Sequence, residues 1–311
     1  MIFGFSRGAY TARSLAGTIR KCGIIDRPTK ERVTEAFELY RLAGPENAPE
    51  QPHISAQRRA MPPSFATSQA DLDWRRANRA PNDPQEVEIL KIAYLGIWDA
   101  VGSLGVPTSI LGPVASMWNR KYRFHDTKLS HMFSAARHAV GLDERRVFYR
   151  PSLWDNLEQT PSSPGLNNGD RSPTRPYQQV WFAGTHRIIG GSGDARELAG
   201  ITLDWVAQGA VDLGFALRAG NLADVAPDPM VDCPELSKPP LVYRLVGALL
   251  DWRKGPGHPV DLDRSVKTQL AGRGDYRPRS LRSLMPHLFG GTAIGVDPDD
   301  EAETVPGGGD R

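Results

Sequence analysis

The sequence predicts an α/β fold, a parallel sheet with flanking helices, from three observations. Residues 1–21 show a short apolar run, a tight glycine turn and then a helical pattern. Residues 89–98 are almost continuously apolar, as are parallel strands that helices cover on both faces. Residues 179–183, Gln-Val-Trp-Phe-Ala, predict a second strand of this kind. Parallel strands place functional groups at their carboxyl ends, so we expect a site at that edge.

The composition indicates an ordinary globular protein. The 311 residues can bury a large core, as one large domain or two modest ones, and 40% are hydrophobic and 24% charged. A net charge of +2 gives no reason to expect nucleic acid as a partner. Cys22 and Cys233 predict reduced thiols and a chain that is cytoplasmic as synthesised. We expect no signal peptide, no transmembrane segment, no metal and no cofactor.

Residues 4–8 read Gly-Phe-Ser-Arg-Gly, which matches the nucleophile elbow of α/β-hydrolases. The turn is sharp, so we expect a Cβ at Gly4 or Gly8 to collide with the neighbouring strand or helix. Ser6 would then lie at a helix N-terminus, where free N–H groups favour negative charge. The backbone N–H of Arg7 would be one oxyanion donor. The alternative is an ordinary glycine and serine loop.

Two later strand ends supply the partners that a serine nucleophile needs. Asp99 follows the strand 89–98 directly, and His186 lies in the glycine-rich loop 184–193 after the second strand. The order Ser6, Asp99, His186 is the order that α/β-hydrolases use. An imidazole can take the serine proton, and a carboxylate can orient the imidazole. Asp99 could instead be a turn or helix-cap residue, and the glycine run a phosphate nest, although it lacks P-loop residues.

The segment after the first helix looks like an insertion. We expect a helix over 31–43, a loop over 44–63 and a polar helix over 66–79. Residues 44–84 would then form an insertion beside the site, either as a lid or as a surface feature without a role.

Further along the chain, apolar spacing predicts a helix over 126–141 and a long amphipathic helix over 197–217. The charged residues 143–146 are either a solvated face or a partly buried ion-pair cluster. We expect a catalytic domain over 1–217, an extension packed on its core over 218–289, and a disordered tail over 290–311.

Four segments together resemble one family. Residues 4–13 read Gly-Phe-Ser-Arg-Gly-Ala-Tyr-Thr-Ala-Arg, and residues 95–102 read Leu-Gly-Ile-Trp-Asp-Ala-Val-Gly. Residues 138–154 carry a His-Ala…Asp-Glu-Arg-Arg…Pro…Trp pattern, and residues 180–186 read Val-Trp-Phe-Ala-Gly-Thr-His. This set resembles a family of bacterial and fungal α/β-hydrolases, mostly uncharacterised, that includes the catalytic domains of type VI secretion phospholipase effectors.

The resemblance implies that Ser6, Asp99 and His186 are the hydrolase triad and that the reaction is hydrolysis of a carboxylic ester. It implies phospholipid as the best-known substrate class. It also implies a type VI secretion component or an immunity protein as a partner, and export by a contact-dependent machine.

The sequence departs from the family pattern in two places. Residues 187–192 read Arg-Ile-Ile-Gly-Gly-Ser, where the family usually has Asp-Val-Gly-Gly-Gly. The family also carries strands and an Asp-Gly-Thr motif before the serine, so we expect an N-terminally truncated sheet that lacks these strands and the second oxyanion donor. The alternative function is therefore an inactive hydrolase remnant or a non-enzymatic accessory or binding protein.

Overall fold

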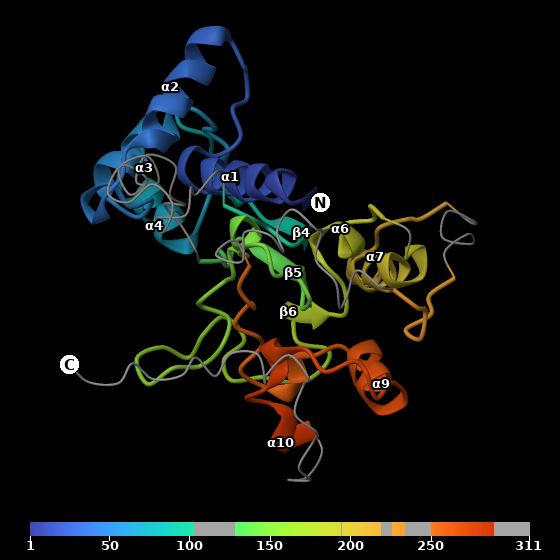
Figure 1. Ribbon diagram of the computed structural model, residues 1–311. Helices are drawn as coiled ribbons and strands as arrows, with labels where there is room; N and C mark the ends of the chain where they lie inside the picture. Colours follow the sequence, from blue (N-terminus) through green and yellow to red (C-terminus); the bar gives the residue numbers. More distant parts are fainter. Residues whose placement is uncertain (103–127, 194, 219–225, 234–249, 289–311) are drawn as a thin grey trace, which may run out of the picture.

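The computed structural model describes residues 1–102, 128–193, 195–218, 226–233 and 250–288. A four-stranded, all-parallel sheet lies at its centre, with helices on both sides (Figure 1). This confirms the α/β fold and the parallel sheet that the sequence predicts. The strands stand in chain order: β1 (Ile2–Phe5), β4 (Ile92–Trp98), β5 (Phe133–Gly141) and β6 (Tyr177–Phe182).

The register of the sheet aligns the carboxyl ends of its strands. Phe5 lies opposite Trp98, and Trp98 lies opposite Ala139. The ladder continues one residue further, since Ser6 N donates to Trp98 O at 3.0 Å and Asp99 N donates to Ala139 O at 2.7 Å. The residues that follow β1 and β4 are therefore fixed side by side at one edge.

Two helices cover opposite faces of this sheet. Helix α1 (Arg7–Cys22) turns its alanines, such as Ala12, onto the face that carries Leu95. Helix α7 (Arg196–Val211) packs on the other face through Val206, against Tyr94. The small residues of α1 let the helix pack closely on the strands. Only Ser6 separates the end of β1 from the first residue of α1.

The helix expected over 126–141 is wrong, because residues 133–141 of this segment form the inner strand β5 and none of the described residues 128–132 is helical. Its apolar residues match helical spacing, but residues 138–141 of β5 are buried in succession on both faces, so its apolar positions need not alternate. It hydrogen-bonds to β4 on one side and β6 on the other. These ladders outweigh the helix propensity of its alanines.

The segment from 44 to 84 is more ordered than a loop. Pro52 stands at the first position of α3 (Pro52–Arg59), where its fixed φ suits a helix start, so the loop expected over 44–63 is wrong there. Arg58 is fully buried and pairs with Asp71 of α4 (Gln69–Ala77) at 2.7 Å. These helices gather with α2 (Lys30–Arg41) at the upper left of Figure 1, away from β6. A role of this segment as a lid stays a prediction.

The region after residue 250 packs against β5 and β6. Leu262 forms a parallel bridge with Trp181, and Val266 of α9 (Arg264–Gly272) joins a buried cluster with Val140. The tail expected over 290–311 lies outside the described residues. The remaining elements are η1 (Pro45–Asn47), β2 (Phe65–Ala66), β3 (Glu88–Ile89), η2 (Val147–Tyr149), α6 (His186–Ile189), η5 (Pro259–Asp261), η6 (Arg279–Leu281) and α10 (Met285–Leu288).

Across the described ranges, no helix combines the length and the apolar character needed to cross a bilayer.

Candidate active site

Ser6 occupies a strained turn between β1 and α1. Its backbone has φ 56° and ψ −120°, a conformation that costs a non-glycine residue about 1–3 kcal/mol. Among the described residues only Ser6, Asp99 and Asn168 combine a side chain with a positive φ. Two of these three are the predicted nucleophile and its carboxylate, and such strain concentrates at functional sites. The turn therefore has the geometry expected of a nucleophile elbow.

The two glycines of the elbow, Gly4 and Gly8, differ in whether the structure leaves room for a Cβ. A Cβ on Gly4 would lie 2.5 Å from the Gly8 carbonyl oxygen, as expected for a position facing the helix. At Gly8 a built Cβ meets no described atom within 4 Å apart from the adjacent residues and the nearby backbone of its own helix, so the collision expected there is wrong. Gly8 lies on the exposed side of the first helical turn, and it is the Gly8 backbone that Gly4 must accommodate.

We expect Gly4→Ala to destabilise the fold by several kcal/mol, because backbone atoms on both sides of the contact cannot move cheaply. Gly8→Ala is the matched control and should be neutral or stabilising by roughly 0.5–1 kcal/mol, since alanine favours a helix. Urea unfolding measures both. Equal losses for the two variants would contradict this account of the elbow.

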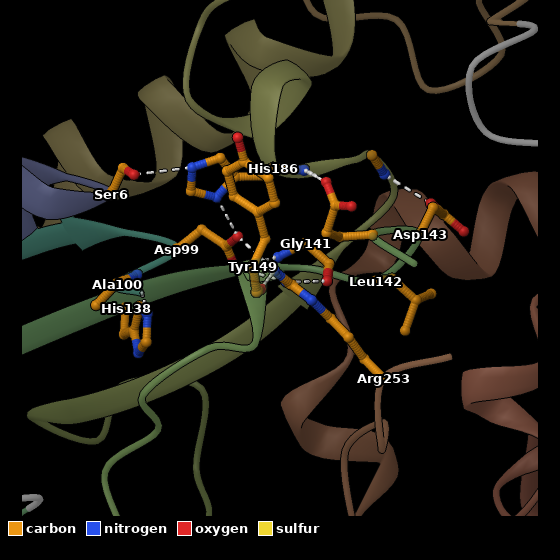
Figure 2. A network of polar contacts seen from close by, with 12 residues as sticks. Ser6, Asp99, Ala100, His138, Gly141, Leu142, Asp143, Tyr149, His186 and Arg253 are labelled. Atoms are coloured by element: carbon orange, nitrogen blue, oxygen red, sulfur yellow. Dashed lines mark hydrogen bonds and ion pairs between the residues drawn. The ribbon is translucent and has the colours of Figure 1, made fainter. Parts of the chain in front are cut away.

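The three residues predicted at strand ends meet in one hydrogen-bonded chain (Figure 2). His186 Nε2 lies 2.9 Å from Ser6 Oγ, and His186 Nδ1 lies 2.6 Å from Asp99 Oδ2. A carboxylate accepts, so the network assigns the proton to Nδ1 and leaves Nε2 as the acceptor of the Ser6 hydroxyl. His186 begins the short helix α6 after β6 and is 4% exposed, whereas Ser6 is half-buried and reachable from outside.

Aromatic rings hold the imidazole in this orientation. The rings of Phe5 and Tyr149 each lie 4.7 Å from the His186 ring, centroid to centroid. Gly190 leaves room for Phe5, because a Cβ there would lie 2.2 Å from the Phe5 ring. The glycine-rich loop therefore serves the packing of the histidine.

Asp99 is fully buried and is held by a residue far along the chain. Arg253 Nη1 lies 2.7 Å from Asp99 Oδ1, and Arg253 Nη2 lies 2.7 Å from Asp99 Oδ2. The Gly141 N–H also donates to Oδ1, at 3.1 Å. Burial alone would raise the pKa of Asp99, but the Arg253 charge and the hydrogen bonds from His186 and Arg253 outweigh it and hold the pKa well below its usual range. Asp99 is therefore ionised in the folded protein.

The charged residues 143–146 form a partly buried ion-pair cluster rather than a solvated face. Glu144 is 2% exposed and pairs with Arg146 through both of its oxygens, at 2.8 and 2.6 Å. Its Oε2 also accepts the backbone N–H of His186 at 3.2 Å. This carboxylate fixes the backbone of the histidine, while Asp99 fixes its ring.

Asp143 anchors the loop before His186 from the other side. Its Oδ2 accepts the Gly184 N–H at 2.7 Å and the Tyr276 hydroxyl at 2.9 Å. Burial raises the pKa of Asp143 to about 7, against the bonds from Gly184 and Tyr276, which lower it. A pKa of about 7 means that the Asp143 carboxyl ionises near neutral pH.

The raised pKa of Asp143 predicts a pH-dependent stability. The folded state binds the proton more tightly than an unfolded carboxyl with a pKa of 3.8, so the stabilisation is full below that value and is lost as the pH rises through about 7. The free energy of unfolding should fall from pH 5 to pH 8 more steeply in the wild type than in Asp143→Asn. Asp204→Asn, at an exposed carboxyl on α7, should keep the wild-type slope. Equal slopes for the wild type and Asp143→Asn would contradict the assignment.

His138 lies near the site but has a structural environment. It is fully buried on β5, its Nε2 accepts the Ala100 N–H at 3.1 Å, and its Nδ1 lies 3.1 Å from Gln179 Oε1. Burial, together with the Arg13 charge, lowers the pKa of His138 to about 3. The neutral ring thus holds the turn after Asp99.

Sequence reasoning missed Arg253, Glu144 and Tyr149 as parts of this site. Arg253 lies 67 residues after His186 and does not follow a predicted strand, so no spacing rule links it to a strand end. The Glu144 segment was visible as a charge run, and its apolar surroundings were the signal for burial.

A family model and a curated relative match parts of this chain. The family model for the catalytic domain of Tle1-like phospholipase effectors of type VI secretion matches residues 1–209. An uncharacterised protein of Saccharomyces cerevisiae, YEL023C, is 29% identical over 161 residues, which are 51% of this chain and 19% of that protein. The chain thus spans about a fifth of the length of this curated relative. No solved structure gives a significant match.

Proposed function

Because the chain belongs to the family of Tle1-like phospholipase effector catalytic domains of type VI secretion, we propose that it hydrolyses carboxylic esters of phospholipids with Ser6 as the nucleophile. The observation that carries the proposal is the chain of contacts from Ser6 Oγ through His186 to Asp99, at 2.9 and 2.6 Å. The family supports a lipid substrate, and the site supports the mechanism.

In the first half of the reaction, His186 Nε2 takes the Ser6 proton while Oγ attacks the acyl carbonyl carbon. The backbone N–H of Arg7 is the first amide of α1, has no intrahelical partner, and donates to the oxyanion that forms. Collapse of this intermediate breaks the bond to the leaving alcohol, which takes the proton from His186. The product is an acyl ester on Ser6.

In the second half, a water molecule gives a proton to His186 Nε2 and attacks the acyl carbonyl carbon. Ser6 leaves with the proton from His186, and a free fatty acid is released. Asp99 stays ionised throughout, because Arg253 and two hydrogen bonds satisfy its oxygens, and it keeps the second imidazole proton on Nδ1.

The same family membership supports delivery by a type VI secretion machine and an immunity protein as a partner. Delivery and partner binding can be tested separately from the chemistry. The chain is purified from cells that carry the secretion genes, and the proteins that copurify with it are identified.

The function is tested by incubating the purified chain with vesicles of phosphatidylethanolamine and phosphatidylglycerol and measuring released fatty acid and lysophospholipid. Wild type should release both, and Ser6→Ala should release neither. Ser14→Ala, on the same helix, should match the wild type. Cleavage of short soluble esters but not of lipid would restrict the function to an esterase. A folded wild type that cleaves neither would contradict the proposal and favour a binding protein.

A further inference from the structure

The buried side chain of Arg253 binds both the Asp99 carboxylate and two backbone carbonyl groups of the site. Its two terminal nitrogens both bind the Asp99 carboxylate, and Nη1 also donates to the Gly141 carbonyl at 2.6 Å. Nη2 also donates to the carbonyl of Tyr149. The side chain therefore joins the carboxylate of the triad to the residue whose ring packs on His186.

The bonds to Asp99 occupy both of its oxygens. Oδ1 accepts from Gly141 and Arg253, and Oδ2 accepts from His186 and Arg253. A bidentate guanidinium fixes the plane of a carboxylate as well as its position. The guanidinium also places a full positive charge next to the Asp99 carboxylate. In the proposed reaction this carboxylate stabilises the protonated ring of His186.

We propose that Arg253 is a positioning residue of the active site, which orients Asp99 and partly cancels the negative charge that Asp99 presents to His186. The proposal deepens the proposed function and rests on it for its catalytic meaning. Its physical consequence is that the Arg253 guanidinium partly compensates the negative charge of Asp99, which on its own would favour the protonated imidazole.

The other charged and titratable groups around His186 do not replace this effect. Glu144 is paired with Arg146, which lies over the Tyr149 ring, and Asp143 faces Tyr276. His138 is buried and neutral on the far side of Ala100. The adjacent Arg187 is exposed. Arg253 is thus the described cation that contacts the carboxylate bound to the histidine.

Through Arg253 the C-terminal region contributes a side chain to the proposed active site. Arg253 lies beyond residues 1–209, which the family model matches. Two residues shortly before it are held in place: Leu250 forms a bridge with Arg146, and Asp251 N donates to Arg145 O at 2.7 Å. The exposed pair of Arg150 and Asp251, at 2.6 Å, ties the same segment, and among the described residues neither side chain forms a hydrogen bond or ion pair with Ser6, Asp99 or His186. That pair offers a matched control.

The test is a pH titration of His186 in the full chain, followed by NMR of ¹³Cε1-labelled histidine and assigned with His186→Gln. Arg253→Met should raise the pKa of His186 by about one unit or more, the shift expected when a neighbouring charge is removed. Arg253→Lys keeps the positive charge but not the two parallel hydrogen bonds of the guanidinium. It should therefore return the pKa of His186 most of the way to the wild-type value. Arg150→Met should titrate as the wild type. If Arg253→Met does not fold, Arg253→Gln carries the same expectation.

A folded Arg253→Met or Arg253→Gln that titrates as the wild type would overturn the inference, as would a lysine variant that titrates like methionine. This readout needs no turnover, so an inactive wild type with the expected shift would remove the proposed function and leave the positioning role. In an active enzyme, the acidic limb of kcat/KM in Arg253→Met should move to higher pH by the same shift, which a merely structural loss would not produce.

Discussion

Ser6→Ala should lower kcat for a phospholipid ester by a factor on the order of 10⁶, and His186→Ala should lower it by a similar factor. The two residues act as one unit, because the hydroxyl is a weak nucleophile until Nε2, 2.9 Å away, takes its proton. The double variant should therefore lose no more than either single variant. The measurement is kcat for all three variants and the wild type on the same lipid vesicles.

His53→Gln is the matched histidine control, because His53 is exposed in the segment 44–84, and it should keep wild-type turnover. Losses in the single variants that multiply in the double variant would show that the two side chains act independently. That result would contradict the account of Ser6 as a nucleophile activated by His186.

Asp99→Asn should affect both turnover and stability. Turnover should fall by about 10⁴-fold, since an amide can hold the imidazole in the wrong tautomer. The free energy of unfolding should fall by about 3–5 kcal/mol, because Arg253 is left buried without its counter-charge. Lipid hydrolysis and urea unfolding of the same preparations measure the two effects.

The combination with Arg253→Met separates these effects. In Asp99→Asn/Arg253→Met the unpaired cation is gone, so part of the lost stability should return while turnover stays low. Asp251→Asn, which breaks the exposed pair with Arg150, should change stability by less than about 1 kcal/mol. An Asp99→Asn variant as stable as the wild type would show that the Arg253 pair does not support the fold.

The strand ends are the part of the site that the sequence could predict. A glycine at position 4, a serine in a strand-to-helix turn, and polar residues after two apolar runs are local signals, and parallel topology brings such ends to one edge. Ser6, Asp99 and His186 lie where this rule places them. Their order and the four family segments predicted the same family that the comparisons found.

Elements that depend on long-range packing could not be predicted in the same way. The segment 126–141 carries helical spacing, and only the neighbouring strands on both sides make its residues 133–141 the strand β5. The contact between Arg253 and Asp99 joins residues 154 positions apart, and neither has a local pattern that points to the other. Gly8 belongs to the elbow motif, but its need for glycine depends on which other element approaches it, and no described atom outside its own stretch of helix does.

The most direct test of the central claim is the reaction of the folded chain with a fluorophosphonate probe, mapped by peptide mass spectrometry. We expect one probe on each chain, bound to Ser6 Oγ, with His186→Gln reacting at least about 10³-fold more slowly because the hydroxyl then lacks its base. No adduct on a folded wild type, or an adduct on another serine while Ser6 stays free, would contradict the claim that Ser6 is an activated nucleophile.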